Sequence, residues 1–73
     1  MTKQEMIKEL VKKWIHNAYD ETTKKCRFYV RDLVIRKLDK RYYKNGIENI
    51  YNQVFIDNKN IDFIFDDAGI HTL

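Results

Sequence analysis

The apolar residues near the N-terminus are spaced as on one face of a helix, and this spacing narrows the possible folds more than any other feature. They recur at steps of three and four residues: Met6, Ile7, Leu10, Val11, Trp14, Ile15 and Ala18. Thr2 is followed three residues later by Glu5, which is the pattern of a capping box at a helix start. The sequence therefore predicts an amphipathic helix over about residues 3–19, with Trp14 turned toward a core.

The rest of the chain mixes strand and helix patterns. Residues 25–31 alternate between apolar and polar side chains, which is typical of a strand with Cys26 on its inner face. Helical spacing follows over 33–44, and Asn45–Gly46 is expected to end that helix. A third helix is predicted over 46–56. A C-terminal strand is then predicted by the alternation over 61–65.

Together these elements predict an α+β fold, in which the strand at 61–65 pairs with the strand at 25–31. The acidic side of the second strand would then lie near Arg27 and Arg31. An all-α three-helix bundle is the alternative, because residues 24–44 also have an apolar stripe with helical spacing.

The length and composition favour one small soluble unit. The chain has 73 residues, about half the usual domain size, so we expect residues 1–73 to form a single domain with a loosely ordered tail at 67–73. Its longest apolar runs have three residues, so no membrane span or secretory signal is expected. The single Cys26 has no partner for an intrachain disulfide, which favours the cytoplasm.

Enzyme and cofactor motifs are not found. Two histidines and one cysteine do not match the spacing of a zinc site. The turn at 57–60 has Lys59 at the third ligand position and lacks the glycine and the glutamate of a calcium loop, and there is no glycine-rich phosphate loop. The sequence therefore predicts a non-enzymatic protein with no metal, no cofactor and no small-molecule substrate.

Charge is unevenly distributed along the chain. The net charge is zero over 1–23, +7 over 24–44 and −4 over 45–73. Tyrosine and arginine, which are abundant here, are enriched where proteins bind one another. We therefore predict a small regulatory or inhibitory protein that binds a host protein, or a second copy as a homodimer, through a basic surface. The predicted contacts are Tyr29, Arg31, Arg36 and Tyr43.

The composition also bears on origin. Ile, Lys, Asn and Tyr make up 30 of the 73 residues, and their codons are rich in A and T. This bias favours a phage or another mobile element from an AT-rich genome.

The alternative function is a small DNA-binding regulator of winged-helix type that uses residues 24–44. Cations would neutralise phosphates, and amides of the third helix would contact bases. The predicted phosphate contacts are Lys25, Arg27, Arg36, Lys37, Lys40, Arg41 and Lys44. The predicted base contacts are Asn49, Asn52 and Gln53.

Overall fold

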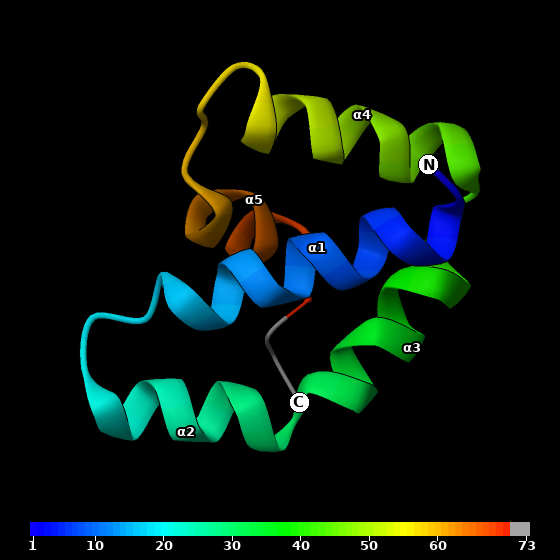
Figure 1. Ribbon diagram of the computed structural model, residues 1–73. Helices are drawn as coiled ribbons and strands as arrows, with labels where there is room; N and C mark the ends of the chain where they lie inside the picture. The colour runs from blue at the N-terminus through cyan, green and yellow to red at the C-terminus, as the bar shows by residue number, and fades with distance from the viewer. Residues whose placement is uncertain (71–73) are drawn as a thin grey trace.

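The computed structural model describes residues 1–70, which form five helices and no strand. The helices are α1 (Lys3–His16), α2 (Glu21–Tyr29), α3 (Arg31–Arg41), α4 (Lys44–Phe55) and α5 (Ile61–Asp67). Helix α1 runs through the middle of the molecule, with α4 on one side of it and α2 and α3 on the other (Figure 1). It packs against each of the other four helices. None of the helices within residues 1–70 has the length and apolar content needed to cross a membrane.

The predicted N-terminal helix is confirmed, including its capping box. The Thr2 hydroxyl accepts a hydrogen bond from the Glu5 backbone N–H at 3.1 Å, and the Glu5 carboxylate accepts one from the Thr2 N–H at 2.8 Å. The Thr2 N–H also lowers the pKa of Glu5 below its ordinary value. The helix ends at His16 rather than near residue 19, and Asn17 is its C-cap.

One hydrophobic core lies between α1 and the helices around it. Trp14 is buried as predicted, and its ring lies 5.7 Å from that of Phe65 in α5. Each helix except α2 contributes buried apolar residues to the core. Besides the five from α1, these are Val34, Leu38, Ile47, Ile50, Val54, Ile61 and Phe65, and Ile70 joins the core from the segment after α5.

The expected α+β fold is wrong, because both predicted strands are helical. Residues 25–31 fall in the end of α2 and the start of α3, and Cys26 is exposed rather than turned inward. The side chain of Asp20 starts α2 by accepting a hydrogen bond from the Thr23 N–H at 2.7 Å. The apolar and polar alternation of this segment therefore did not mark a buried face.

The predicted strand at 61–65 is also a helix. Asn60 caps its start by accepting a hydrogen bond from the Asp62 N–H at 2.8 Å. Ile61 and Phe65, four residues apart, are buried, whereas Phe63 between them is 74% exposed. A strand would have turned all three of these apolar side chains toward one face, so the burial pattern follows a helix.

The all-α alternative fits the fold, although residues 1–70 contain five helices rather than three. The chain turns at Val30, so 24–44 is not one helix. The helices expected over 33–44 and 46–56 are present with shifted bounds. Asn45–Gly46 lies in the first turn of α4 instead of ending the helix before it, and the chain turns at Tyr42–Tyr43.

The segment after α5 is part of the core. Gly69 adopts a φ of 68°, a left-handed conformation that glycine adopts without strain. This turn lets the Ile70 N–H donate to the Phe65 carbonyl at 2.9 Å and places the Ile70 side chain fully inside. A loosely ordered tail was expected over 67–73; its residues 67–70 are placed here, and residues 71–73 lie outside the described part of the chain.

Two phenylalanines of α5 provide a matched test of the core. We expect Phe65→Ala to lower the free energy of unfolding by about 3–5 kcal/mol, because it empties a fully buried site against Trp14. Phe63→Ala removes the same side chain from an exposed position and should change stability little. Urea unfolding followed by circular dichroism measures both. Equal losses would contradict the assigned faces of α5.

The charge of Asp20 should make stability depend on pH. The Thr23 backbone N–H holds the pKa of Asp20 below its ordinary value, so the folded state favours the ionised carboxylate. That stabilisation is present above the ordinary aspartate pKa and is lost as the pH falls through the lowered value. Wild type should therefore melt at a higher temperature than Asp20→Asn at neutral pH, with the gap closing as acid protonates the carboxylate in the folded protein. A gap that persists in acid would refute this role.

Candidate functional site

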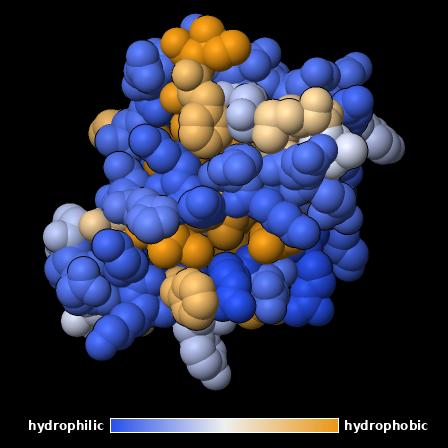
Figure 2. Space-filling view, viewed as in Figure 1, coloured by the Kyte–Doolittle hydropathy of each residue, from blue (hydrophilic) through white to orange (hydrophobic). Residues whose placement is uncertain are grey.

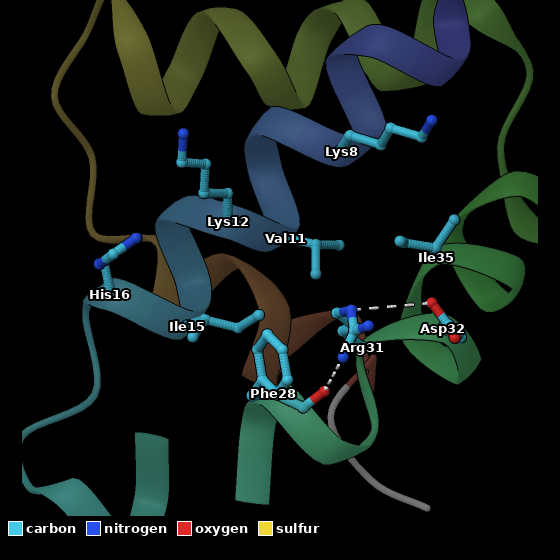
Figure 3. Close-up of a pocket in the computed structure, with 9 residues that line it drawn as sticks. All are labelled: Lys8, Val11, Lys12, Ile15, His16, Phe28, Arg31, Asp32 and Ile35. Carbon is cyan, nitrogen blue, oxygen red and sulfur yellow. Dashed lines mark hydrogen bonds and ion pairs between the residues drawn. The ribbon is translucent and has the colours of Figure 1, made fainter. Parts of the chain in front are cut away.

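An open groove lies between α1 and the α2–α3 pair. It has a volume of about 450 Å³. Figure 2 shows apolar atoms exposed in the depression between α1 and α2, with hydrophilic residues on both sides. The residues that line it are Lys8, Val11, Lys12, Ile15, His16, Phe28, Arg31, Asp32 and Ile35 (Figure 3).

The floor of the groove is apolar. Ile15 of α1, Phe28 of α2 and Ile35 of α3 approach it from three helices (Figure 3). Phe28 is 55% exposed, because α2 lies at the edge of the molecule and buries none of its residues fully. An exposed aromatic ring beside two half-buried isoleucines forms an apolar surface, and covering such a surface with another molecule is energetically favourable.

A second hollow of about 430 Å³ continues this groove along α2. The two hollows share Ile15, His16 and Phe28, and the second one extends to Glu21 and Tyr29. We call the two together the α1–α2 groove. Because α1 and α2 lie side by side and antiparallel, the groove is elongated (Figure 1).

Cations border the α1–α2 groove on both sides. Lys8 and Lys12 come from α1, and Lys24 and Lys25 come from α2. Lys24 lies 3.8 Å from the Glu21 carboxylate. Lys8, Lys12 and Lys25 form no ion pair within residues 1–70. The groove therefore combines an apolar floor with a basic rim.

Arg31 is a fixed cation inside the groove. Its guanidinium lies 4.0 Å from the centre of the Phe28 ring and donates to the Phe28 carbonyl at 3.0 Å. Its Nε atom lies 4.0 Å from the Asp32 carboxylate (Figure 3). The ring and the guanidinium hold each other in place, so this part of the site is ordered before any partner arrives.

Arg27 attaches α2 to the rest of the protein. Its Nη1 atom donates to the Trp14 carbonyl at 2.6 Å, and its guanidinium lies 4.9 Å from the centre of the Trp14 ring. The same Nη1 atom is 2.9 Å from Asp62 Oδ1 in α5, an ion pair without an aligned hydrogen bond. Asn17 donates to the other Asp62 oxygen at 2.9 Å. The sequence analysis expected Arg27 to lie near the acidic residues of 61–65. The contact with Asp62 is present, but it joins two helices instead of a pair of strands.

Two cations of α3 form hydrogen bonds with backbone carbonyls at the C-terminal end of α5. Lys37 donates to the Gly69 carbonyl at 3.2 Å, and Arg41 donates to the Ala68 carbonyl. Carbonyls at the end of a helix have no partner within it, and cations there also interact favourably with the helix dipole. Lys37 and Arg41 therefore hold α3 against the C-terminal segment.

The predicted DNA contacts do not lie together on one surface of the structure. Arg27, Lys37 and Arg41 are engaged within the protein, whereas the other four predicted phosphate contacts are exposed on three helices: Lys25, Arg36, Lys40 and Lys44. The predicted base contacts Asn49, Asn52 and Gln53 lie on α4, across α1 from α2 and α3 (Figure 1). The winged-helix arrangement is wrong, because residues 1–70 contain no strand to form a wing.

The predicted protein contacts are only partly brought together. Tyr29 and Arg31 border the α1–α2 groove, whereas Arg36 is exposed on α3 and Tyr43 lies at the corner between α3 and α4. Sequence reasoning missed Lys8, Lys12, Ile15 and Phe28, which are four of the groove's main residues. The one sequence feature that pointed to this groove was Ile15, which lies at the edge of the apolar stripe of α1, on the same side as Lys8 and Lys12.

Residues 1–70 contain no cluster of three or more His, Cys, Asp and Glu side chains that could hold a metal ion. No protein family matches the chain, and neither curated proteins nor solved structures give a significant match. The α1–α2 groove is thus the feature of the described residues that has the clearest binding chemistry.

Replacing Arg27 should loosen α2. Arg27→Lys keeps the charge but cannot reach the Trp14 carbonyl and Asp62 in the same geometry. Hydrogen bonds to charged groups contribute about 1.5–3 kcal/mol, so we expect α2 amides to exchange roughly ten- to a hundredfold faster. Hydrogen exchange measured by NMR tests this. Lys25→Ala, an exposed change in the same helix, is the control, and equal exchange in both variants would contradict the anchoring role.

Proposed function

We propose that this chain is a non-enzymatic regulatory or inhibitory protein of the cytoplasm, which acts by binding another protein in the α1–α2 groove. The observation that carries the proposal is the combination of an exposed apolar floor and a rim of lysines. Protein interfaces are built in this way, with an apolar centre that supplies most of the affinity and a polar border.

The floor has the composition of an interface hot spot. Aromatic residues and arginines dominate such centres, and here the Phe28 ring and the Arg31 guanidinium lie in contact. Because these two side chains already hold each other, a partner loses little affinity to ordering them. Burying apolar surface contributes roughly 25 cal/mol per Å², so covering this ring and its neighbours favours association.

The rim supports an acidic partner. Lys8 and Lys12 line one hollow of the groove and Lys25 lines the other, and none of the three forms an ion pair within residues 1–70. Uncompensated charges of one sign steer a partner of opposite charge and raise the association rate. Such attraction between exposed charges weakens as salt is added.

Protein binding is better supported than DNA binding. Three of the seven cations expected at phosphates hold helices together instead, namely Arg27, Lys37 and Arg41. An exposed phenylalanine on an apolar floor also adds nothing to phosphate contact, which depends on charge and hydrogen bonding.

Site-specific photo-crosslinking tests the proposal. The photoreactive residue p-benzoylphenylalanine is placed at Phe28 in the groove or, as a control, at Phe63 on α5. In cells that encode the chain, the Phe28 probe should form an adduct with one acidic protein, and Lys12→Glu should reduce the yield of that adduct several-fold. The Phe63 probe should not form it.

Three results would count against the proposal. Equal adducts from both positions, or an adduct whose yield is unchanged in Lys12→Glu, would show that the groove does not select the partner. An adduct between two copies of the chain would assign the groove to a homodimer rather than to another protein.

A further inference from the structure

We infer that the α1–α2 groove accepts a short amphipathic α-helix with acidic flanks. This inference rests on the proposed function, because it names the kind of protein segment that docks there. Three properties of the groove carry it, which are its length, its helical walls without a strand edge and the placement of charge along its two rims.

The length of the groove matches about two helical turns. Along α1 it extends from Lys8 to His16, and eight residue steps of a helix cover about 12 Å. Two turns of a docked helix have the same length and place side chains at i, i+3 or i+4, and i+7 on one face. The two hollows, which meet at Ile15 and Phe28, give such side chains adjacent positions.

The backbone of the walls excludes pairing with an extended segment. All three walls are helices, and residues 1–70 offer no strand edge with which an extended segment could form a ladder of hydrogen bonds. An extended segment pressed onto the apolar floor would bury N–H and C=O groups without partners, at a cost of about 1–3 kcal/mol each. A helix satisfies its own backbone, so it can cover the floor with side chains alone.

The charges suit a helix that is acidic on both flanks. Lys8 and Lys12 lie along one side of the floor, and Lys24 and Lys25 lie along the other. The two carboxylates that line the groove, Glu21 and Asp32, pair with Lys24 and Arg31, so the rims stay basic. A helix that turns an apolar face to the floor directs its two flanks toward these rims. Carboxylates on both flanks would then meet lysines, which gives the segment a recognisable pattern of apolar anchors between acidic residues.

Three synthetic peptides test the inference against the full chain. The first, about 16 residues long so that it can form a helix, carries leucines at three- and four-residue steps flanked by glutamates. The second has a central proline that breaks the helix. The third has lysines in place of the glutamates. Fluorescence anisotropy gives the affinities, and NMR shifts of the labelled chain locate the site.

We expect only the first peptide to bind in the groove, shifting the amides of Ile15, Phe28 and Ile35. The proline peptide should bind at least tenfold more weakly, because proline inside a helix costs about 3 kcal/mol. Lys12→Glu should weaken the first peptide about five- to tenfold. Lys40→Glu makes the same charge change on an exposed residue of α3 that does not line the groove, and it should leave binding unchanged.

Other outcomes separate this inference from the proposed function. Equal binding of the helical and proline peptides in the groove would overturn the helix but leave the groove as a docking surface. No binding of the first peptide, or equal binding after Lys12→Glu, would overturn the acidic helix, while the crosslink from Phe28 would still test whether a protein docks there. If the NMR signals of the groove residues shift with the concentration of the chain in the absence of peptide, a second copy occupies the groove, and the inference of an acidic helix is overturned.

Discussion

Burial of one face of α1 is the interaction on which the rest of the structure depends. Helices of 7 to 14 residues are marginal in water on their own, so each of the five needs a neighbour that covers its apolar face. Helix α1 contacts all four others and supplies Trp14 to the ring of Phe65. The capping box at Thr2 and Glu5 fixes where this central helix begins, and the spacing of its apolar residues determines which side chains face its neighbours.

The groove exists because α2 is attached in a different way from the other helices. It buries no residue fully and is tied down by the guanidinium of Arg27, which reaches the Trp14 carbonyl and Asp62. Its other contacts are packing against α1 and α3, in which no side chain of α2 is fully buried. Phe28 is left at the surface beside Ile15, and the two side chains line the groove together.

The cations of the basic segment 24–44 have two different roles, and the net charge of the segment does not show which residue has which role. Arg27, Lys37 and Arg41 donate to backbone carbonyls of other elements and hold the helices in position. Lys24 and Lys25 instead border the groove together with lysines of α1. Charge along the sequence predicted a basic surface over 24–44, but the rim draws half of its lysines from a segment whose net charge is zero.

Helix α1, its capping box and the burial of Trp14 could be predicted from the residues, because apolar spacing and cap residues act over a few neighbouring positions. That 25–31 and 61–65 are helical could not be predicted in this way, since an alternating run of apolar residues fits a strand until packing shows which of them are buried. The groove was equally out of reach, because its floor joins Ile15, Phe28 and Ile35 from three helices. Such a surface forms only when the helices pack together, so the pattern of residues within any one segment does not predict it.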